Sequence, residues 1–341
     1  MVNRFIMIFK FPYLLSVIGV LLLGAGCKGS DASVQNASEI DSSRICSVKF
    51  NADSAFSFVK AQCDFGARTP NSEAIERCGD YIVRKFRGHG LDVTEQRTVV
   101  KGWDGKDLRC RNIIAAYKPE LADRIIIAGH YDARPWADHD PDSTLHRTPV
   151  MAANDGASGI AVMMEIARQI DRLNLAVGID FICFDAEDYG APYWAPQEAQ
   201  DNADNWCLGS QYWSRNPHRP NYTARYGVLL DMVGGRGSKF HYEGFSLQFA
   251  QDVVVRAWEA ARYAEAADFF PQENGGYVTD DHVPMNTIAL IPTINIIPYN
   301  KGANFTSHWH TTHDTPENID PATLRAVGQT VLQLLSEENS N

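Results

Sequence analysis

Apolar runs alternate along the chain with stretches in which apolar positions recur at helical spacing. Residues 177–184 and 226–231 are nearly continuous apolar runs, which predict buried strands. Residues 92–100 alternate between polar and apolar, as is typical of a half-buried edge strand. Further strands are expected over 110–117, 124–129 and 289–297, and helices over 51–63, 71–86, 160–173, 206–214, 245–263 and 321–337. Asn51 and Asn71 are the expected caps of the first two helices.

The order of these elements predicts an α/β fold, because strands and helices alternate through most of the chain. We expect one domain with a mixed, mostly parallel central β-sheet flanked by helices. The alternating early strands predict an antiparallel edge. The loop over residues 133–153 is long for a compact domain, and such loops are usually functional or disordered.

The N-terminal segment, residues 1–27, has a basic start and an apolar stretch too short for a typical membrane-spanning helix. It ends in small residues before Cys27 and resembles a bacterial lipoprotein signal, although Gly24 stands where leucine is usual. We therefore expect an exported, periplasmic protein held at a membrane through a lipid on Cys27. A plain signal peptide or an uncleaved anchor are the alternatives. Residues 28–43 are polar and predict a tether, which leaves 44–341 as the catalytic domain.

Composition excludes some classes of function. The chain has 42 acidic and 31 basic residues, a net charge of −11, which argues against a nucleic-acid partner. Six cysteines follow Cys27, but none has the Cys-x-x-Cys spacing of a thiolate zinc site. Neither their pairing nor the oligomeric state follows from the sequence.

Acidic and histidine side chains collect where the predicted strands end. Glu187 and Asp188 directly follow the strand at 177–184, and open α/β sheets bind ligands at such carboxyl ends. The other candidates are His130, Asp132, Asp155, Asp231, Asp280, Asp281, His282 and His310. Each alone has a plain explanation, such as a solvated turn or a helix cap. Together, without cysteine, they predict a catalytic zinc site that keeps one position open.

The set also resembles a known family. His130, Asp132, Asp155, Glu187-Asp188, Asp231 and His310 look like the co-catalytic zinc aminopeptidases (peptidase family M28), whose fold is a mixed sheet wrapped by helices. More narrowly, the chain from about Ala52 onward is similar to the animal-type glutaminyl cyclases. The similar segments are Asn154-Asp155, Phe184-Asp185-Ala186-Glu187-Asp188, Trp194-Ala195-Pro196-Gln197, Leu230-Asp231-Met232-Val233-Gly234, Asp280-Asp281-His282-Val283-Pro284 and Trp309-His310-Thr311.

The resemblance implies a metal site with one zinc per chain, held by Asp155, Asp188 and His310. One ligand departs from the family pattern, because Asp188 stands where the animal enzymes have glutamate. Its side chain is one methylene shorter, so the metal or the strand end must shift slightly.

The resemblance also implies roles around the metal. Glu187 would carry the proton, Asp280 would hydrogen-bond Glu187 and position it, and Asp231 would receive the α-amine of the substrate. Trp194 and Trp309 would wall the pocket for the glutamine side chain.

The expected activity is that of a glutaminyl-peptide cyclotransferase, which converts the N-terminal glutamine of peptides or proteins to pyroglutamate and releases ammonia. Asn295 stands where the animal cyclases have a histidine in a proton relay, so that relay is expected to be simpler here. A di-zinc aminopeptidase is the first alternative, because His130, Asp155 and Asp231 match the residues that hold a second metal. The tryptophan motifs favour the cyclase. A non-catalytic, lipid-anchored binding protein is the remaining alternative, although such a protein would be expected to lose ligands.

Overall fold

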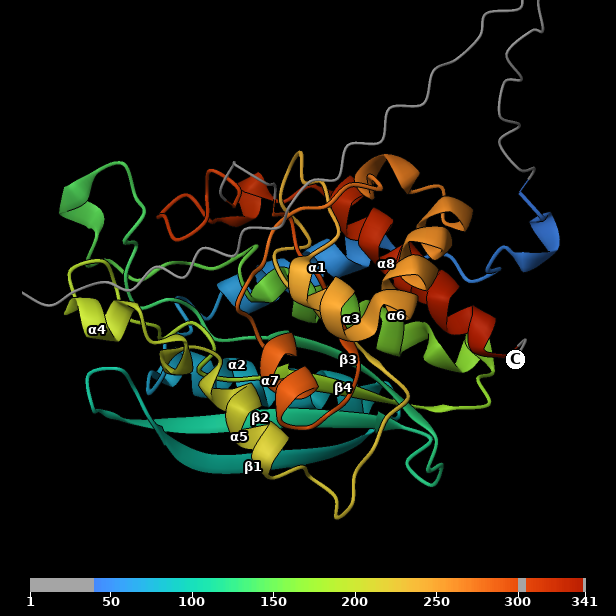
Figure 1. The fold of residues 1–341 in the computed structure, drawn as a ribbon, viewed down its shortest axis with the longest axis horizontal. Helices are drawn as coiled ribbons and strands as arrows, with labels where there is room; N and C mark the ends of the chain where they lie inside the picture. Colours follow the sequence, from blue (N-terminus) through green and yellow to red (C-terminus); the bar gives the residue numbers. More distant parts are fainter. Residues whose placement is uncertain (1–39, 300–304, 340–341) are drawn as a thin grey trace, which may run out of the picture. The chain divides into compact units, whose positions relative to one another are not determined.

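The protein contains one six-stranded sheet in the described ranges of its computed structural model, residues 40–299 and 305–339 (Figure 1). The strands are β1 (Asp92–Lys101), β2 (Asp107–Tyr117), β3 (Arg124–His130), β4 (Gly178–Phe184), β5 (Gly227–Leu230) and β6 (Thr293–Ile296). Their order is β1-β2-β4-β3-β5-β6; β4, β3, β5 and β6 run parallel, whereas β2 pairs antiparallel with both β1 and β4. The mixed, mostly parallel sheet and its antiparallel edge are thereby confirmed.

Burial follows the position of each strand in the sheet. Every residue of β3 and β4 is buried, because helices cover both faces of the central strands. Edge strand β1 contains no fully buried residue, and its Val99 is 58% exposed. The continuous apolar runs and the alternating run in the sequence therefore correspond to central and edge strands.

Helices form a layer on each face of the sheet. One face is covered by α1 (Ala52–Cys63), α2 (Glu73–Gly88), α3 (Ala157–Gln169), α6 (Gly244–Tyr263) and α8 (Pro321–Ser336). The other face packs against α5 (Leu208–Arg215) and α7 (His282–Thr287), and the short α4 (Gln197–Gln200) lies in a loop. Figure 1 shows α1, α3, α6 and α8 grouped together, apart from α5 and α7. Within these described ranges, none of the helices has the length and apolar content needed to cross a bilayer.

The caps of the first two helices differ in how well the sequence predicted them. Asn51 caps α1 as expected, since its side chain accepts a hydrogen bond from Ser54 N at 3.0 Å. The prediction for α2 was wrong: Ser72 is the cap, and its Oγ accepts from Ile75 N. Asn71 instead adopts a left-handed backbone (φ 69°) and its side chain bonds the backbone of β2. Because Asn tolerates that conformation, the side chain serves a turn rather than a helix end.

Helix α3 begins at Ala157, three residues before the predicted start, and continues as a 3₁₀ turn, Ile170–Leu173. Arg168 is the one residue of α3 that is not buried. The helix therefore lacks the exposed polar face that apolar positions at helical spacing predict. Its neighbours α1, α8 and β3 surround it. This burial fixes the N-terminal end of α3 at the carboxyl ends of the parallel strands, where the candidate residues lie.

Candidate metal and substrate site

The candidate site lies at the carboxyl ends of the parallel strands. His130 ends β3, Asp231 follows β5, and the Glu187-Asp188 pair follows β4. After β4 the chain turns sharply, because Ala186 has a left-handed backbone (φ 55°). Asp132 holds this turn: its two carboxylate oxygens accept hydrogen bonds from the Glu187 and Asp188 backbone N–H groups, each at 3.1 Å.

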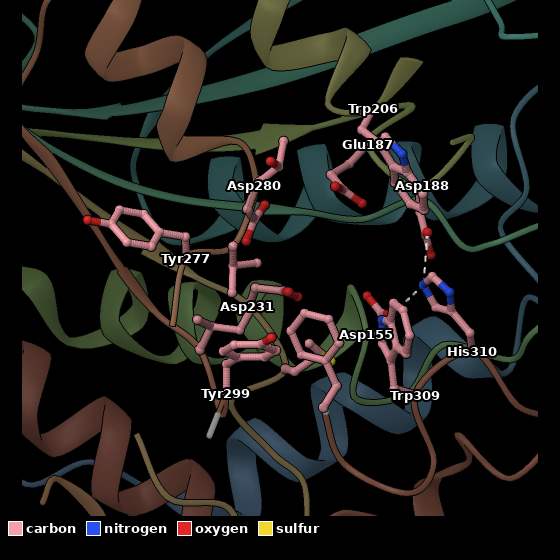
Figure 2. Close-up of a pocket in the computed structure, with 15 residues that line it drawn as sticks. Asp155, Glu187, Asp188, Trp206, Asp231, Tyr277, Asp280, Tyr299, Trp309 and His310 are labelled. Carbon is pink, nitrogen blue, oxygen red and sulfur yellow. Dashed lines mark ion pairs between the residues drawn. The ribbon is translucent and has the colours of Figure 1, made fainter. Parts of the chain in front are cut away.

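Asp155, Asp188 and His310 meet as the sequence predicted (Figure 2). His310 Nε2 lies 3.2 Å from Asp188 Oδ1 and 3.5 Å from Asp155 Oδ2. One ligand atom from each side chain lies within 4.8 Å of the others, and all three residues are buried. Among the described residues, Asp188 Oδ2 is buried without a hydrogen-bond partner. Two buried carboxylates, one of them with an unsatisfied oxygen, and an imidazole form a donor set that suits a divalent zinc ion.

Asp155 also faces a second cluster. His130 Nε2 lies 3.1 Å from Asp155 Oδ1 and 3.3 Å from Asp231 Oδ1, so the two oxygens of Asp155 serve different clusters. Burial would lower the pKa of His130, but hydrogen bonds with Asp132, Asp155 and Asp231 outweigh it and raise the pKa well above its ordinary value. His130, Asp155 and Asp231 also lie close enough together to form a second candidate metal site.

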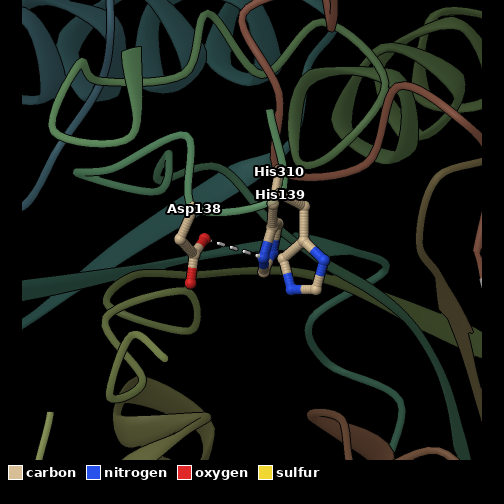
Figure 3. A group of neighbouring side chains, drawn as sticks. All are labelled: Asp138, His139 and His310. Atoms are coloured by element: carbon tan, nitrogen blue, oxygen red, sulfur yellow. Dashed lines mark ion pairs between the residues drawn. The ribbon is translucent and has the colours of Figure 1, made fainter. Parts of the chain in front are cut away.

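His310 is supported from behind by Asp138 (Figure 3). Its Nδ1 lies 3.5 Å from Asp138 Oδ1, an arrangement that orients Nε2 toward Asp155 and Asp188. Asp138, His139 and His310 together could hold a cation by distance. Arg134 already fills that role, however, because its Nε and Nη2 donate to the two Asp138 oxygens at 2.7 and 2.6 Å. We therefore assign this group to the support of His310.

Arg134 is a central part of that support. The side chain is 2% exposed and lies over the rings of Trp136 and Trp206. Its Nη1 also lies 3.2 Å from the Asp188 carbonyl and 3.4 Å from Asp188 Oδ1. A single guanidinium thus touches one expected metal ligand directly and supports another through Asp138.

Glu187 points toward the same cavity without belonging to the three-residue cluster (Figure 2). Its carboxylate lies near the carboxylate of Asp280 and the thiol of Cys207. One oxygen of each carboxylate and the Cys207 sulfur lie within 4.8 Å of one another. Burial raises the pKa of Glu187 well above its ordinary value; His130 opposes this shift, and Asp188 and Asp280 add to it. A buried carboxyl group with a raised pKa is suited to accept a proton and return it during a reaction.

Asp280 is held by neighbours on both oxygens. Its Oδ1 accepts from Asp281 N at 2.5 Å and its Oδ2 from Asn295 Nδ2 at 2.6 Å. Asn295, which the resemblance placed where the animal cyclases have a histidine, thus holds Asp280 through its side-chain amide. His282, another candidate, faces away and pairs with Glu243 at 2.9 Å.

The cavity above these groups has a volume of about 260 Å³ and carries aromatic side chains. Trp309 lines it, as expected. Trp194 is not among the described residues that line it, but packs against Trp136 and Tyr193. The second tryptophan at the cavity is Trp206, whose ring is parallel to His310 within 9°. The other ring-bearing lining residues are Tyr277, Tyr299 and Phe305.

Sequence reasoning missed several residues that hold the site. Asp314 accepts hydrogen bonds from the backbone N–H groups of Asn154 and Asp155, at 2.7 and 3.0 Å. The sequence feature that could have indicated Asp314 is its position as an acidic residue four positions after His310, in the same loop. The sequence signal for Trp206 was its place just before α5. The next residue, Cys207, donates its backbone N–H to the Glu187 carbonyl and so brings this segment to the site. Arg134 and Asp138 lie in the loop over 133–153, which is therefore functional.

The chain is similar to known proteins over most of its length. The model of peptidase family M28 matches residues 112–335. A solved structure of Bacteroides thetaiotaomicron glutaminyl cyclase, bound to N-acetylhistamine, is 47% identical with a TM-score of 0.84, and the match covers 85% of this chain and 99% of that one.

Two further proteins are informative. A solved structure named a leucine aminopeptidase precursor, also from Bacteroides thetaiotaomicron, is 47% identical with a TM-score of 0.83, over 86% of this chain and 99% of that one. The glutaminyl-peptide cyclotransferase of Boiga irregularis is 25% identical over 295 residues, 77% of this chain and 76% of the relative. The family model spans the chain from within β2 to the last turn of α8, and this range includes all the site residues discussed above. The chain belongs to peptidase family M28.

Proposed function

We propose that the protein is a glutaminyl-peptide cyclotransferase, which converts the N-terminal glutamine of peptides or proteins to pyroglutamate and releases ammonia. The observation that carries this proposal is the buried Glu187, placed beside the Asp155–Asp188–His310 cluster but outside it, in a small aromatic cavity. The similarity to solved and curated glutaminyl cyclases supports it.

One zinc ion would be held by Asp155, Asp188 and His310, which match the donor set described above. When bound, it would supply a Lewis acid for the γ-amide oxygen of the glutamine.

The reaction is intramolecular. The α-amine nitrogen attacks the γ-amide carbon, the bond from that carbon to the amide nitrogen breaks, and ammonia leaves. Glu187 takes the proton that the amine loses and returns it to the departing nitrogen; such proton transfer is typically worth about 10²- to 10⁴-fold in rate. Because the nucleophile belongs to the substrate, no water needs activation, and good orientation supplies a large effective molarity.

Asp231 and the aromatic rings would orient the substrate. Burial raises the pKa of Asp231 to about 8, with His130 opposing and Asp280 adding. An incoming α-amine can hydrogen-bond to this carboxyl group. Trp206 and Trp309 would pack against the apolar part of the glutamine side chain and exclude water from the reacting atoms.

The decisive experiment compares two substrates with the same zinc-loaded protein. A glutamine-initiated dipeptide should yield ammonia and pyroglutamate, while a leucine-initiated dipeptide should remain intact. Release of free N-terminal residues from both peptides, without ammonia, would contradict the proposal. His310→Ala should lower the zinc content, and unchanged zinc would contradict the ligand assignment.

A di-zinc aminopeptidase is the second candidate. His130, Asp155 and Asp231 lie within 4.8 Å of one another and could hold a further metal, and one similar structure is named a leucine aminopeptidase precursor. Two tightly held zinc ions per chain, with hydrolysis of the leucine peptide, would favour this candidate.

We also propose that the protein is exported and held in the periplasm by a lipid on Cys27, with a tether over 28–43 before the catalytic domain, 44–341. Cys27 lies outside the described residues, so support comes from the sequence of the N-terminal segment. Cys27→Ser should move the protein from the membrane fraction to the soluble fraction, whereas a protein that stays with the membrane would contradict a lipid anchor.

A further inference from the structure

Tyr277 is an exposed aromatic residue at the mouth of the active-site cavity. Its side chain lines the cavity, yet the residue is 65% exposed. The ring is well seated: it packs edge-to-face on Phe245 with centroids 4.9 Å apart, and a Cβ at Gly244 would fall 2.6 Å from it. A large apolar ring that is held in place and exposed to solvent at the rim of a binding cavity is well placed to contact a ligand.

Tyr277 also lines a second cavity, of about 490 Å³. Its lining includes Tyr242, Leu247, Gln248 and residues 274–276. None of the described residues that line it has a charged side chain. A charged group placed there would lose water without gaining a partner, so the cavity suits an uncharged, apolar group.

The positions of the reactive groups indicate which part of a substrate reaches Tyr277. In Figure 2, Asp188 and His310 lie on one side of Asp231, and Tyr277 lies on the other. Under the proposed function, the γ-amide points to the metal ligands and the α-amine to Asp231. The rest of the peptide then leaves on the side of Asp231 that is away from the metal ligands, where Tyr277 stands.

We propose that Tyr277 and the adjoining cavity bind a bulky apolar side chain on the residue that directly follows the N-terminal glutamine. This inference rests on the proposed function and names its preferred substrates: peptides whose second residue is aromatic or large and aliphatic. Contact with a fixed aromatic ring and burial in the cavity favour such side chains over glycine.

A different exit would select a different substrate. Phe305 separates the active-site cavity from another one, whose lining includes Arg236, Lys239 and His308. A peptide that left in that direction would be favoured by an acidic second residue. The ring centroids of Tyr299 and Trp309 lie 4.9 and 4.6 Å from that of Phe305, whereas Tyr277 is 65% exposed, so we expect the peptide to leave past Tyr277.

The test uses zinc-loaded protein and three amidated tripeptides that differ only at the second residue: Gln-Phe-Ala, Gln-Gly-Ala and Gln-Glu-Ala. Ammonia release should give kcat/KM for the phenylalanine peptide roughly fivefold to tenfold above that for the glycine peptide. Tyr277→Ala should reduce this ratio to near one, while Tyr277→Phe, which keeps the ring, should preserve it. Val255→Ala, at a 58% exposed position of α6, the helix that contains Phe245, is the control and should leave the ratio unchanged.

The outcomes separate the two proposals. Equal rates for the phenylalanine and glycine peptides, or a ratio that Tyr277→Ala does not change, would overturn this inference alone. A preference for the glutamate peptide would overturn it in favour of the Arg236 side. Absence of ammonia from all three peptides would overturn the proposed function, and this inference with it. Thermal melting of the variants shows whether a changed ratio reflects the site rather than the fold.

Discussion

Glu187 and Asp188 are neighbours in sequence with different surroundings. Asp188 contacts His310 and Arg134, whereas Glu187 lies beside Asp280 and Cys207. Glu187→Gln should therefore keep the zinc content and lower turnover by about 10²- to 10⁴-fold, because it removes the proton carrier but no ligand. Atomic absorption and ammonia release measure the two effects. Glu198→Gln, in the exposed α4, is the control, and loss of zinc from Glu187→Gln would show that Glu187 is itself a ligand.

Arg134 gives a second prediction at the level of single residues. Arg134→Met should weaken zinc binding by roughly tenfold to a hundredfold, because Asp138 and Asp188 lose the cation that orients them. Competition with a chelator measures the affinity. Arg147→Met, which removes a guanidinium over the Trp194 ring at 4.6 Å, is the matched control. An unchanged affinity in Arg134→Met would reduce Arg134 to a packing role.

The residues that sequence could find are those whose chemical type is itself the signal. Asp155, Asp188 and His310 were predicted because acids and a histidine follow predicted strands in family motifs, and they meet in the structure. Trp206 and Arg134 do not carry such a signal. Arg134 meets Asp188 across 54 positions of sequence, a contact that exists only once the sheet brings the two loops together.

At the level of elements, the strands were predictable because their apolar runs differ clearly from the polar segments between them. The surroundings of α3 were not predictable. A helix covered on all sides requires several neighbours, and those neighbours come from distant parts of the chain. Close packing then leaves a trace in small residues: a Cβ at Gly159 of α3 would fall 2.2 Å from the Leu230 carbonyl oxygen, at the end of β5.

Gly159→Ala should therefore destabilise the protein by about 1–3 kcal/mol or more, because backbone must move to admit one methyl group. Gly88→Ala, at the end of α2, is the matched control. Nothing in the described part of the chain lies within 4 Å of its Cβ position, so alanine there should be neutral or slightly stabilising. Urea denaturation measures both variants; equal effects would show that α3 can shift away from β5 at little cost.

At the level of the whole molecule, sequence predicted the fold class, but it did not predict the strand order. Strand β4 lies between β2 and β3, so it pairs antiparallel on one side and parallel on the other. The apolar runs of the strands are alike, and the hydrophobic pattern does not state which run pairs with which.

The stability of the whole protein should depend on pH through His218. Burial lowers the pKa of His218 to about 4, and its Nδ1 accepts a hydrogen bond from Trp213 Nε1 at 3.2 Å. A histidine held neutral stabilises the fold above its ordinary pKa of 6.5, and this contribution is lost as the pH falls from 6.5 to 4. The loss is at most about 3 kcal/mol.

His218→Gln keeps an acceptor for Trp213 but does not titrate. Denaturation of both proteins at pH 7 and pH 4 should show that any stability advantage of the wild type at pH 7 shrinks at pH 4. An advantage that stays constant between the two pH values would mean that His218 titrates alike in the folded and unfolded chain.

The buried acids around the site link metal binding to the stability of the entire fold. Asp155, Glu187, Asp188, Asp231 and Asp280 are all buried near one another, and their repulsion opposes folding unless a cation balances it. Removing zinc with a chelator should therefore lower the melting temperature, and zinc at a hundred times its dissociation constant should restore about 2.7 kcal/mol. Calorimetry of Asp188→Asn, which loses a ligand charge, should show a much smaller response to zinc at the same concentration. An equal response in both proteins would place the stabilising ion outside the Asp155–Asp188–His310 cluster.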